Sequence, residues 1–248
     1  MKPAKAKKPA AKLAKRPAVM TGASIPVLRW PPDEDRVETI FERLSAVMPE
    51  PKTELDFSNP FTLVVAVALS AQATDVSVNK ATERLFKVAD TPEKMLALGE
   101  EGLIPYIASI GLYRGKAKNV IALSRIVLEQ HGGQVPLNRA DLQALPGVGR
   151  KTASVVLNEL GIEAAIAVDT HVFRVSHRLG LANAGTPDKV EAQLFKVVPE
   201  DWLPKAHHWL ILHGRYTCTA RKPKCLSCII ADLCPSRAGL MALGETAG

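Results

Sequence analysis

The sequence predicts an all-α fold, and three observations support this prediction. Beyond Pro31 and Pro32, apolar residues recur at the spacing of amphipathic helices, helix start and stop signals separate these runs, and no segment alternates apolar and polar residues as a half-buried strand would. No internal repeat with a period of about 20 to 50 residues is evident, which argues against a solenoid. The chain has 248 residues, of which 47% are hydrophobic, so it can bury a core as one large or two modest domains.

Individual segments along the chain support the prediction. Residues 61–69 have no polar face, which predicts a helix buried in the core. The segments Thr91-Pro92-Glu93 and Thr186-Pro187-Asp188 each place a capping threonine before a proline at the first helical position. Residues 35–48 form one helix whose apolar stripe is Val37, Ile40, Phe41, Leu44 and Val47. Predicted helix ends lie at Gly99, Gly111, Gly132, Gly161 and Gly180.

Composition and charge limit where the protein acts. No apolar run reaches the length of about 18 residues that a membrane span needs, and the first residues lack the apolar core of a secretory signal, so a soluble intracellular protein is expected. The net charge is +7, but seven of the 32 Lys and Arg residues lie in residues 1–24, where there is no acid, and the remaining 25 cations balance the 25 acids. Residues 1–24 therefore predict a disordered basic tail, which either adds salt-sensitive affinity for nucleic acid or only improves solubility.

The four cysteines lie close together near the C-terminus, with the spacing C-x6-C-x2-C-x5-C. Thiols this crowded indicate a metal centre, and the spacing favours a [4Fe-4S] cluster, because structural zinc sites usually present two tight pairs and only the central pair is tight here. Two disulfides are disfavoured because nothing marks the chain as secreted. Zinc and disulfides stay open as alternatives on spacing alone. The candidate ligands are Cys218, Cys225, Cys228 and Cys234.

A glycine-containing segment, LPGVGRKT at 145–152, lies between two helical patterns and predicts a helical hairpin. Gly147 and Gly149 permit backbone conformations closed to other residues and let a phosphate approach, while the free N–H groups of the second helix and Arg150 favour an anion. Such a hairpin holds a DNA backbone without reading bases. A nucleotide-binding P-loop is the rival, and it fails because Ala144 occupies its first glycine position and Arg150 its lysine position.

Two ionisable residues suggest chemistry. Lys151 follows Arg150 in the first turn of the second helix, where the helix dipole and the adjacent cation both disfavour an ammonium group and favour a free amine able to attack carbon. The alternative is a solvated lysine that touches phosphate. An apolar run, 165–168, leads to Asp169, and either Asp169 or Thr170 can cap the next helix. Held near Lys151, the carboxylate could also accept its proton or stabilise positive charge on a sugar ring.

Taken together, the hairpin LPGVGRKTA, the segment VDTHVFRV and the four-cysteine spacing resemble the endonuclease III branch of the helix-hairpin-helix DNA glycosylases, over roughly residues 30–235. The resemblance implies that Lys151 is the nucleophile, that Asp169 is the catalytic aspartate and that the cysteines bind a [4Fe-4S] cluster. It also implies that Gln72 and Leu112 fill the gap left when a damaged pyrimidine is flipped out of the duplex. The expected reaction is base removal through a lysine Schiff base, followed by strand cleavage 3′ to the abasic site by β-elimination.

The resemblance further implies two helical domains with double-stranded DNA bound between them. Residues 53–163 would form a six-helix domain that contains the hairpin, residues 25–52 and 164–238 would form a discontinuous cluster domain, and residues 239–248 would form a C-terminal tail. A cluster would fix the loop between its first two cysteines as a basic surface against phosphates. The cations expected to contact DNA there are Arg215, Arg221, Lys222 and Lys224.

Two rival functions remain open. The related adenine glycosylases typically lack a lysine at the position of Lys151, carry a catalytic glutamate near the position of Val67 and add a C-terminal domain. A non-catalytic DNA-binding module would keep the fold and cluster for structure alone, which the presence of both Lys151 and Asp169 disfavours. A monomer in a bacterial cytoplasm, associated with the nucleoid, is the expected setting, and the basic tail leaves organellar or nuclear targeting open.

Overall fold

The fold is all-α, as predicted. The computed structural model describes residues 29–245, and no strand occurs in that range. Its helices, in chain order, are α1 (Glu34–Val47), α2 (Pro60–Ser70), α3 (Asp75–Leu85), α4 (Pro92–Ile107), α5 (Tyr113–His131), α6 (Arg139–Ala144), α7 (Arg150–Glu159), α8 (Thr170–Leu179), α9 (Pro187–Val197), α10 (Leu203–Tyr216) and α11 (Arg237–Glu245), with short 3-10 turns at Glu200–Trp202 and Cys225–Ser227.

Local capping residues set where these helices begin. The hydroxyl of Thr91 accepts a hydrogen bond from the backbone N–H of Lys94, and Pro92 opens α4, which confirms the predicted start. Thr186 and Pro187 start α9 in the same way, although the Thr186 side chain forms no cap hydrogen bond. Gly99 has a φ of 69° and breaks α4 into two helical segments, so the predicted stop becomes a kink.

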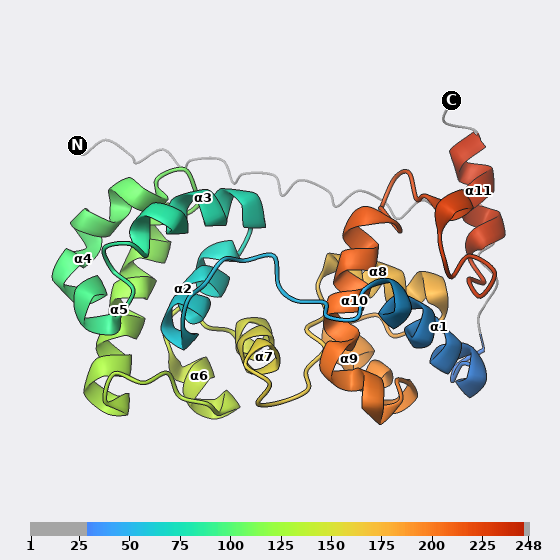
Figure 1. Ribbon diagram of the computed structural model, residues 1–248, viewed down its shortest axis with the longest axis horizontal. Coiled ribbons are helices and arrows are strands. Elements are labelled where there is room, and N and C mark those ends of the chain that lie inside the picture. Colours follow the sequence, from blue (N-terminus) through green and yellow to red (C-terminus); the bar gives the residue numbers. More distant parts are fainter. Residues whose placement is uncertain (1–28, 246–248) are drawn as a thin grey trace, which may run out of the picture.

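Two separate hydrophobic cores divide the described residues into two lobes that lie side by side (Figure 1). One core, within residues 55–157, is built on α2, in which every residue from Phe61 to Leu69 is buried, as predicted. The other combines α1 with residues 166–230 and includes Phe41 and Trp209, whose rings lie 6.1 Å apart. The chain therefore leaves the second lobe after α1 and returns to it before α8. The predicted domain limits stay a prediction, which these separate cores support.

Polar side-chain contacts join the two lobes. His208 of α10 lies 2.9 Å from the buried carboxylate of Glu159 at the end of α7. At the other end of α7, Arg150 pairs with Glu191 of α9 at 2.7 Å. Because α7 is tied to the second lobe at both of its ends, the helix that carries Lys151 has a fixed position relative to α8 and α10.

The structure adds two details at the ends of elements that the sequence did not show. Val47 is 67% exposed rather than buried on the α1 stripe, because α1 ends at this residue. The segment expected as a tail from residue 239 is helical to Glu245, because residues 237–245 are rich in strong helix formers and Leu240 is buried. The basic tail of residues 1–24 lies outside the described residues.

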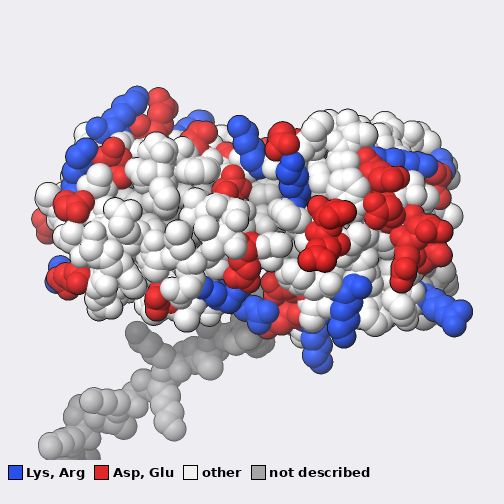
Figure 2. All heavy atoms as spheres, turned by 60° about the horizontal axis from the view of Figure 1, so that its bottom comes forward, with Lys and Arg blue, Asp and Glu red and all other residues white. Residues whose placement is uncertain are grey.

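Surface charge on the face shown in Figure 2 is mixed rather than uniformly basic. Acidic side chains gather over the half of the molecule built by α1 and α8–α11, while Lys and Arg are scattered. Positive charge on this face is therefore not concentrated in one patch. Among the described residues, no helix is long and apolar enough to cross a membrane.

Candidate active site and nucleic-acid interface

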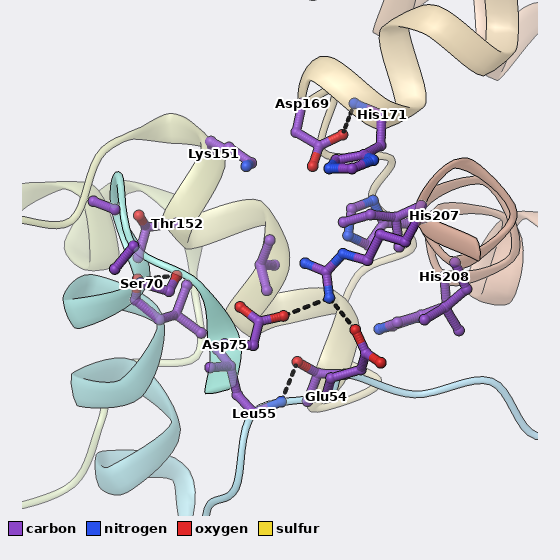
Figure 3. Close-up of a pocket in the computed structure, with 18 of the residues that line it drawn as sticks. Glu54, Leu55, Ser70, Asp75, Lys151, Thr152, Asp169, His171, His207 and His208 are labelled. Carbon is purple, nitrogen blue, oxygen red and sulfur yellow. Dashed lines mark hydrogen bonds and ion pairs between the residues drawn. The ribbon is translucent and has the colours of Figure 1, made fainter. Parts of the chain in front are cut away.

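A cavity of about 490 Å³ lies between the two lobes. The first lobe contributes α7, the end of α2 and the start of α3, and the second contributes α8 and α10. Lys151 and Asp169 lie on opposite walls of this cavity and their side chains point into it (Figure 3). Both residues singled out for catalysis from the sequence therefore border one space, although they come from different lobes.

Lys151 is the second residue of α7, whose N-cap is Gly149. No side chain caps this helix and no acid lies in its first turn, so the positive end of the helix dipole is not neutralised locally. The charge of Arg150 affects Lys151 less than its adjacent position in the sequence suggests. The guanidinium of Arg150 pairs with Glu191 at 2.7 Å and lies 3.7 Å from Asp188, so much of its charge is compensated away from Lys151.

Asp169 is the N-cap of α8, which settles the choice between Asp169 and Thr170. Its Oδ1 accepts hydrogen bonds from the backbone N–H groups of His171 and Val172, both at 2.8 Å. Both bonds end on the same oxygen, so Oδ2 accepts none from the described residues. The cap holds the carboxylate in place, and the second oxygen is available to the cavity.

The three histidines of α10 are buried, which fits the predicted packing role, and the Nδ1 atom of His207 has no hydrogen-bond partner among the described residues. His207 lines the cavity and is only 3% exposed. Burial, together with the nearby His208, Lys151 and Arg215, lowers the pKa of His207 to about 3. This side chain is therefore neutral at the back of the cavity and adds no positive charge near Lys151.

Arg215, predicted to contact DNA, is paired with two carboxylates of the protein. Its guanidinium donates to the carboxylates of Glu54 and Asp75, and the hydroxyl of Tyr216 also donates to Glu54. Both of these carboxylates border the cavity, where Figure 3 labels Glu54 and Asp75. The contact of Arg215 with DNA stays a prediction, and the structure adds this internal pairing. The sequence could not show this, because the partners precede it by more than 130 residues.

The predicted hairpin is formed by α6 and α7, and its two glycines differ. Gly147 has a φ of +81°, and a Cβ there would lie 3.1 Å from side-chain atoms of Asn119. Gly149 has an ordinary φ of −84°, and a Cβ there would meet nothing within 4 Å. Gly147 is needed by the fold itself, whereas no contact among the described residues requires Gly149, which leaves its N–H and the start of α7 open to an external anion.

Gln72 and Leu112 share an uncommon backbone conformation. They are the two non-glycine residues with positive φ among residues 29–245, at 56° and 62°, and both are exposed. Both line a second cavity, of about 540 Å³, together with Gly147 of the hairpin. Strained backbone of this kind is concentrated at functional sites. The positive φ is therefore an independent reason to retain Gln72 and Leu112 as candidates. The residue types in the sequence do not indicate it.

The four cysteines line one cavity, and none of them forms a disulfide. No group of three His, Cys, Asp or Glu side chains in residues 29–245 is close enough to hold a single metal ion. Four thiols around one cavity fit a single inorganic core held by four cysteine ligands. Burial raises the pKa of Cys234 to about 11 and also raises the pKa of Cys225 and Cys228.

The loop between Cys218 and Cys225 presents its three cations to solvent. Arg221, Lys222 and Lys224 are all exposed. Arg178 of α8 holds the loop from beneath, since its guanidinium donates to the backbone carbonyls of residues 219 and 220 at 2.7 and 2.9 Å and to Sγ of Cys218 at 3.4 Å. Sequence reasoning missed Arg178, because an arginine in the last turn of a helix normally reads as a solvated residue.

Comparisons with known proteins agree with this arrangement. The family model described as HhH-GPD superfamily base excision DNA repair protein matches residues 65–200, and the iron-sulfur binding domain of endonuclease III matches residues 218–234. Endonuclease III of Escherichia coli (strain K12) is 60% identical over 195 residues, which is 79% of this chain and 92% of that protein. Endonuclease III of Haemophilus influenzae is 57% identical over 80% of this chain and 94% of that protein. A solved structure of a trapped endonuclease III–DNA covalent intermediate has a TM-score of 0.79 at 42% identity, and the match covers 85% of this chain and 99% of that one.

Proposed function

We infer the reaction of this chain from one premise, that it belongs to the endonuclease III family of HhH-GPD base excision DNA repair proteins. It is a DNA glycosylase and abasic-site lyase, and it carries a [4Fe-4S] cluster. We propose that its substrates are oxidised or ring-saturated pyrimidines in duplex DNA, together with abasic sites. We also propose that it acts as a monomer in a bacterial cytoplasm, at the nucleoid.

DNA would be held at three places in this proposal. The open N–H groups at Gly149 and the start of α7 would bind phosphate from one lobe, and the exposed cations of the loop 219–224 would bind it from the other. The cluster, bound by Cys218, Cys225, Cys228 and Cys234, would supply a fixed attachment for both ends of that loop. Gln72 and Leu112 would occupy the space left in the duplex by the extruded nucleotide.

Chemistry would begin at Lys151. Its neutral amine attacks C1′ of the extruded nucleotide, the bond from C1′ to the base breaks, and the base leaves with the bonding electrons and takes up a proton. The sugar ring opens as a Schiff base forms, and loss of a proton from C2′ then expels the 3′ phosphate by β-elimination. The free Oδ2 of Asp169 would accept a proton from Lys151 and stabilise positive charge that develops on the sugar.

The observation that carries this proposal is that Lys151 and Asp169 point into one cavity of about 490 Å³ from opposite walls (Figure 3). A second observation argues against an adenine glycosylase. Val67, near the position at which those enzymes carry a catalytic glutamate, is an apolar side chain that borders the same cavity.

Borohydride trapping tests the proposal directly. Reduction should convert wild-type protein mixed with abasic-site duplex into a covalent adduct, and Lys151→Ala should form none. Lys52→Ala is the matched control, because Lys52 lines the same cavity and its loss should leave the adduct intact. An adduct that survives in Lys151→Ala, or a wild-type protein that yields neither adduct nor nicked strand, would overturn the proposal.

Duplexes that each carry a single lesion test the substrate class. Base release should be fastest from duplexes with a ring-saturated or oxidised pyrimidine and undetectable from undamaged DNA. Release of adenine opposite oxidised guanine, without a reducible adduct, would instead identify an adenine glycosylase. Gel filtration of the cluster-containing protein would check the expected monomer.

A further inference from the structure

Lys116 of α5 is a lysine with an unusual environment. It is only 8% exposed, and its ammonium Nζ donates to the backbone carbonyl of Leu69 at 2.9 Å. Burial lowers the pKa of Lys116, and no neighbouring charge contributes. A lysine buried without a carboxylate costs stability, so this group is expected to serve a purpose beyond packing.

The carbonyl that Lys116 binds belongs to the last turn of α2. That helix has no basic residue of its own in its last turn, so the ammonium from α5 supplies the positive charge that the C-terminal end of a helix favours. Gln72, with its left-handed backbone, lies three residues after Leu69. Lys116 therefore fixes the start of the turn that carries Gln72.

Lys116 also lies one helical turn after the other strained position. The backbone N–H of Lys116 donates to the carbonyl of Leu112 at 3.1 Å, which is the first hydrogen bond of α5. Leu112 is the N-cap of this helix and has no side-chain cap. One residue thus contacts the turns of both Gln72 and Leu112, and all three line the same cavity.

We propose that Lys116 is a positioning residue that sets the spacing between Gln72 and Leu112 and so prepares the protein to receive a duplex from which a base is extruded. This rests on the proposed function, in which those two side chains replace the extruded nucleotide. Without the ammonium, the turn after α2 loses its attachment to α5, and the left-handed conformation of Gln72 is free to relax. Base extrusion from an intact pair then loses support, whereas chemistry at Lys151 is untouched.

The test compares two substrates that differ in how much extrusion they require. Lys116→Met keeps the length and the apolar stem but removes the donor. It should slow single-turnover release of a paired damaged pyrimidine by about tenfold or more, as expected for the loss of a hydrogen bond from a charged group, and slow β-elimination at a preformed abasic site by less than about threefold. Lys116→Arg should restore release. Lys118→Met is the control, because Lys118 lies exposed on the same helix and both rates should stay at the wild-type level.

Equal losses on the two substrates would overturn the inference, since they would show general damage to the fold, and so would unchanged rates on both. If Lys116→Met does not fold, Lys116→Gln removes the charge with less loss of polarity, and the ratio of its two rates decides in the same way. A wild-type protein that fails to form a Schiff base would contradict the proposed function itself, which separates that failure from a failure of this inference.

Discussion

Replacing the two hairpin glycines with alanine, one at a time, separates the needs of the fold from the needs of DNA binding. At Gly147 the φ of +81° disfavours any L-residue, and the new methyl group would lie 3.1 Å from Cβ and Nδ2 of Asn119. At Gly149 the φ of −84° suits alanine, and the methyl group would meet no atom within 4 Å. The two substitutions are chemically identical, so any difference between them reports the local structure.

The magnitudes follow from these geometries. A left-handed conformation costs an L-residue about 1–2 kcal/mol, and restricting the unfolded chain returns about 0.4–1 kcal/mol. The close approach to Asn119 adds to the cost, so Gly147→Ala should destabilise the protein by about 1–2 kcal/mol. Gly149→Ala gains the same unfolded-state benefit and loses part of a favourable N-cap, so its net effect on the free energy of unfolding should lie within about 0.5 kcal/mol of zero.

Urea unfolding followed by circular dichroism measures the first difference, and binding to a duplex with a stable abasic-site analogue measures the second. Gly149→Ala should keep the wild-type unfolding midpoint yet bind the duplex about tenfold more weakly, because its methyl group occupies the space a phosphate needs. Equal destabilisation by both variants would refute the structural reasoning. Wild-type affinity in Gly149→Ala would refute the assigned phosphate contact.

Three further substitutions test the catalytic cap, a buried histidine and the basic loop. Asp169→Asn keeps an oxygen that caps α8, so its melting temperature should match that of the wild type, while base release should fall by about a hundredfold or more. Asp169→Ala should lose the cap as well and melt at a lower temperature. A fully active Asp169→Asn variant would exclude acid–base chemistry at this residue. The pKa of His207 is about 3 in the folded protein, against 6.5 for an unperturbed histidine. Between these two pH values the unfolded chain binds a proton at this histidine and the folded chain does not. The free energy of unfolding therefore decreases as the pH falls below 6.5. His207→Gln should therefore flatten the decline of the melting temperature below pH 6.5, and an unchanged slope would contradict the burial argument. Lys222→Ala should reduce the slope of log affinity against log salt by about 0.9, whereas Lys87→Ala, at an exposed site on a different lobe, should leave it unchanged.

Features encoded within a few residues were accessible from the sequence. The start of α4 at Thr91, the cap at Asp169 and the hairpin around Gly147 each depend on residue types at fixed short spacing, which local rules describe well. The buried helix α2 was predictable because an entirely apolar run has no other place than a core. Even so, the exposure of Val47 was not predictable, because a helical stripe does not show where the packing partner ends.

Features that depend on distant partners were not accessible. The ion pairs of Arg215 with Glu54 and Asp75 join residues more than 130 positions apart, and nothing near Arg215 distinguishes a paired arginine from one that faces solvent. Arg178 was missed for the same reason, since its role depends on the loop that follows Cys218. In both cases the residue type was visible and the partner was not, so charge counting along the chain could not separate a phosphate contact from an internal ion pair.

Residues placed by their sequence neighbours and residues placed by distant partners have different roles in the proposed site. Lys151 and Asp169 each depend on a helix start, so each is placed by its own few neighbours. Their separation is not local, because it depends on the pairs that tie α7 to the second lobe, such as His208 with Glu159. Substitutions at those pairs should therefore alter catalysis without touching a reacting group. Lys151 and Asp169, which the sequence indicates, carry the chemistry. Contacts such as His208 with Glu159, which the sequence does not indicate, determine how far apart these two reacting groups lie.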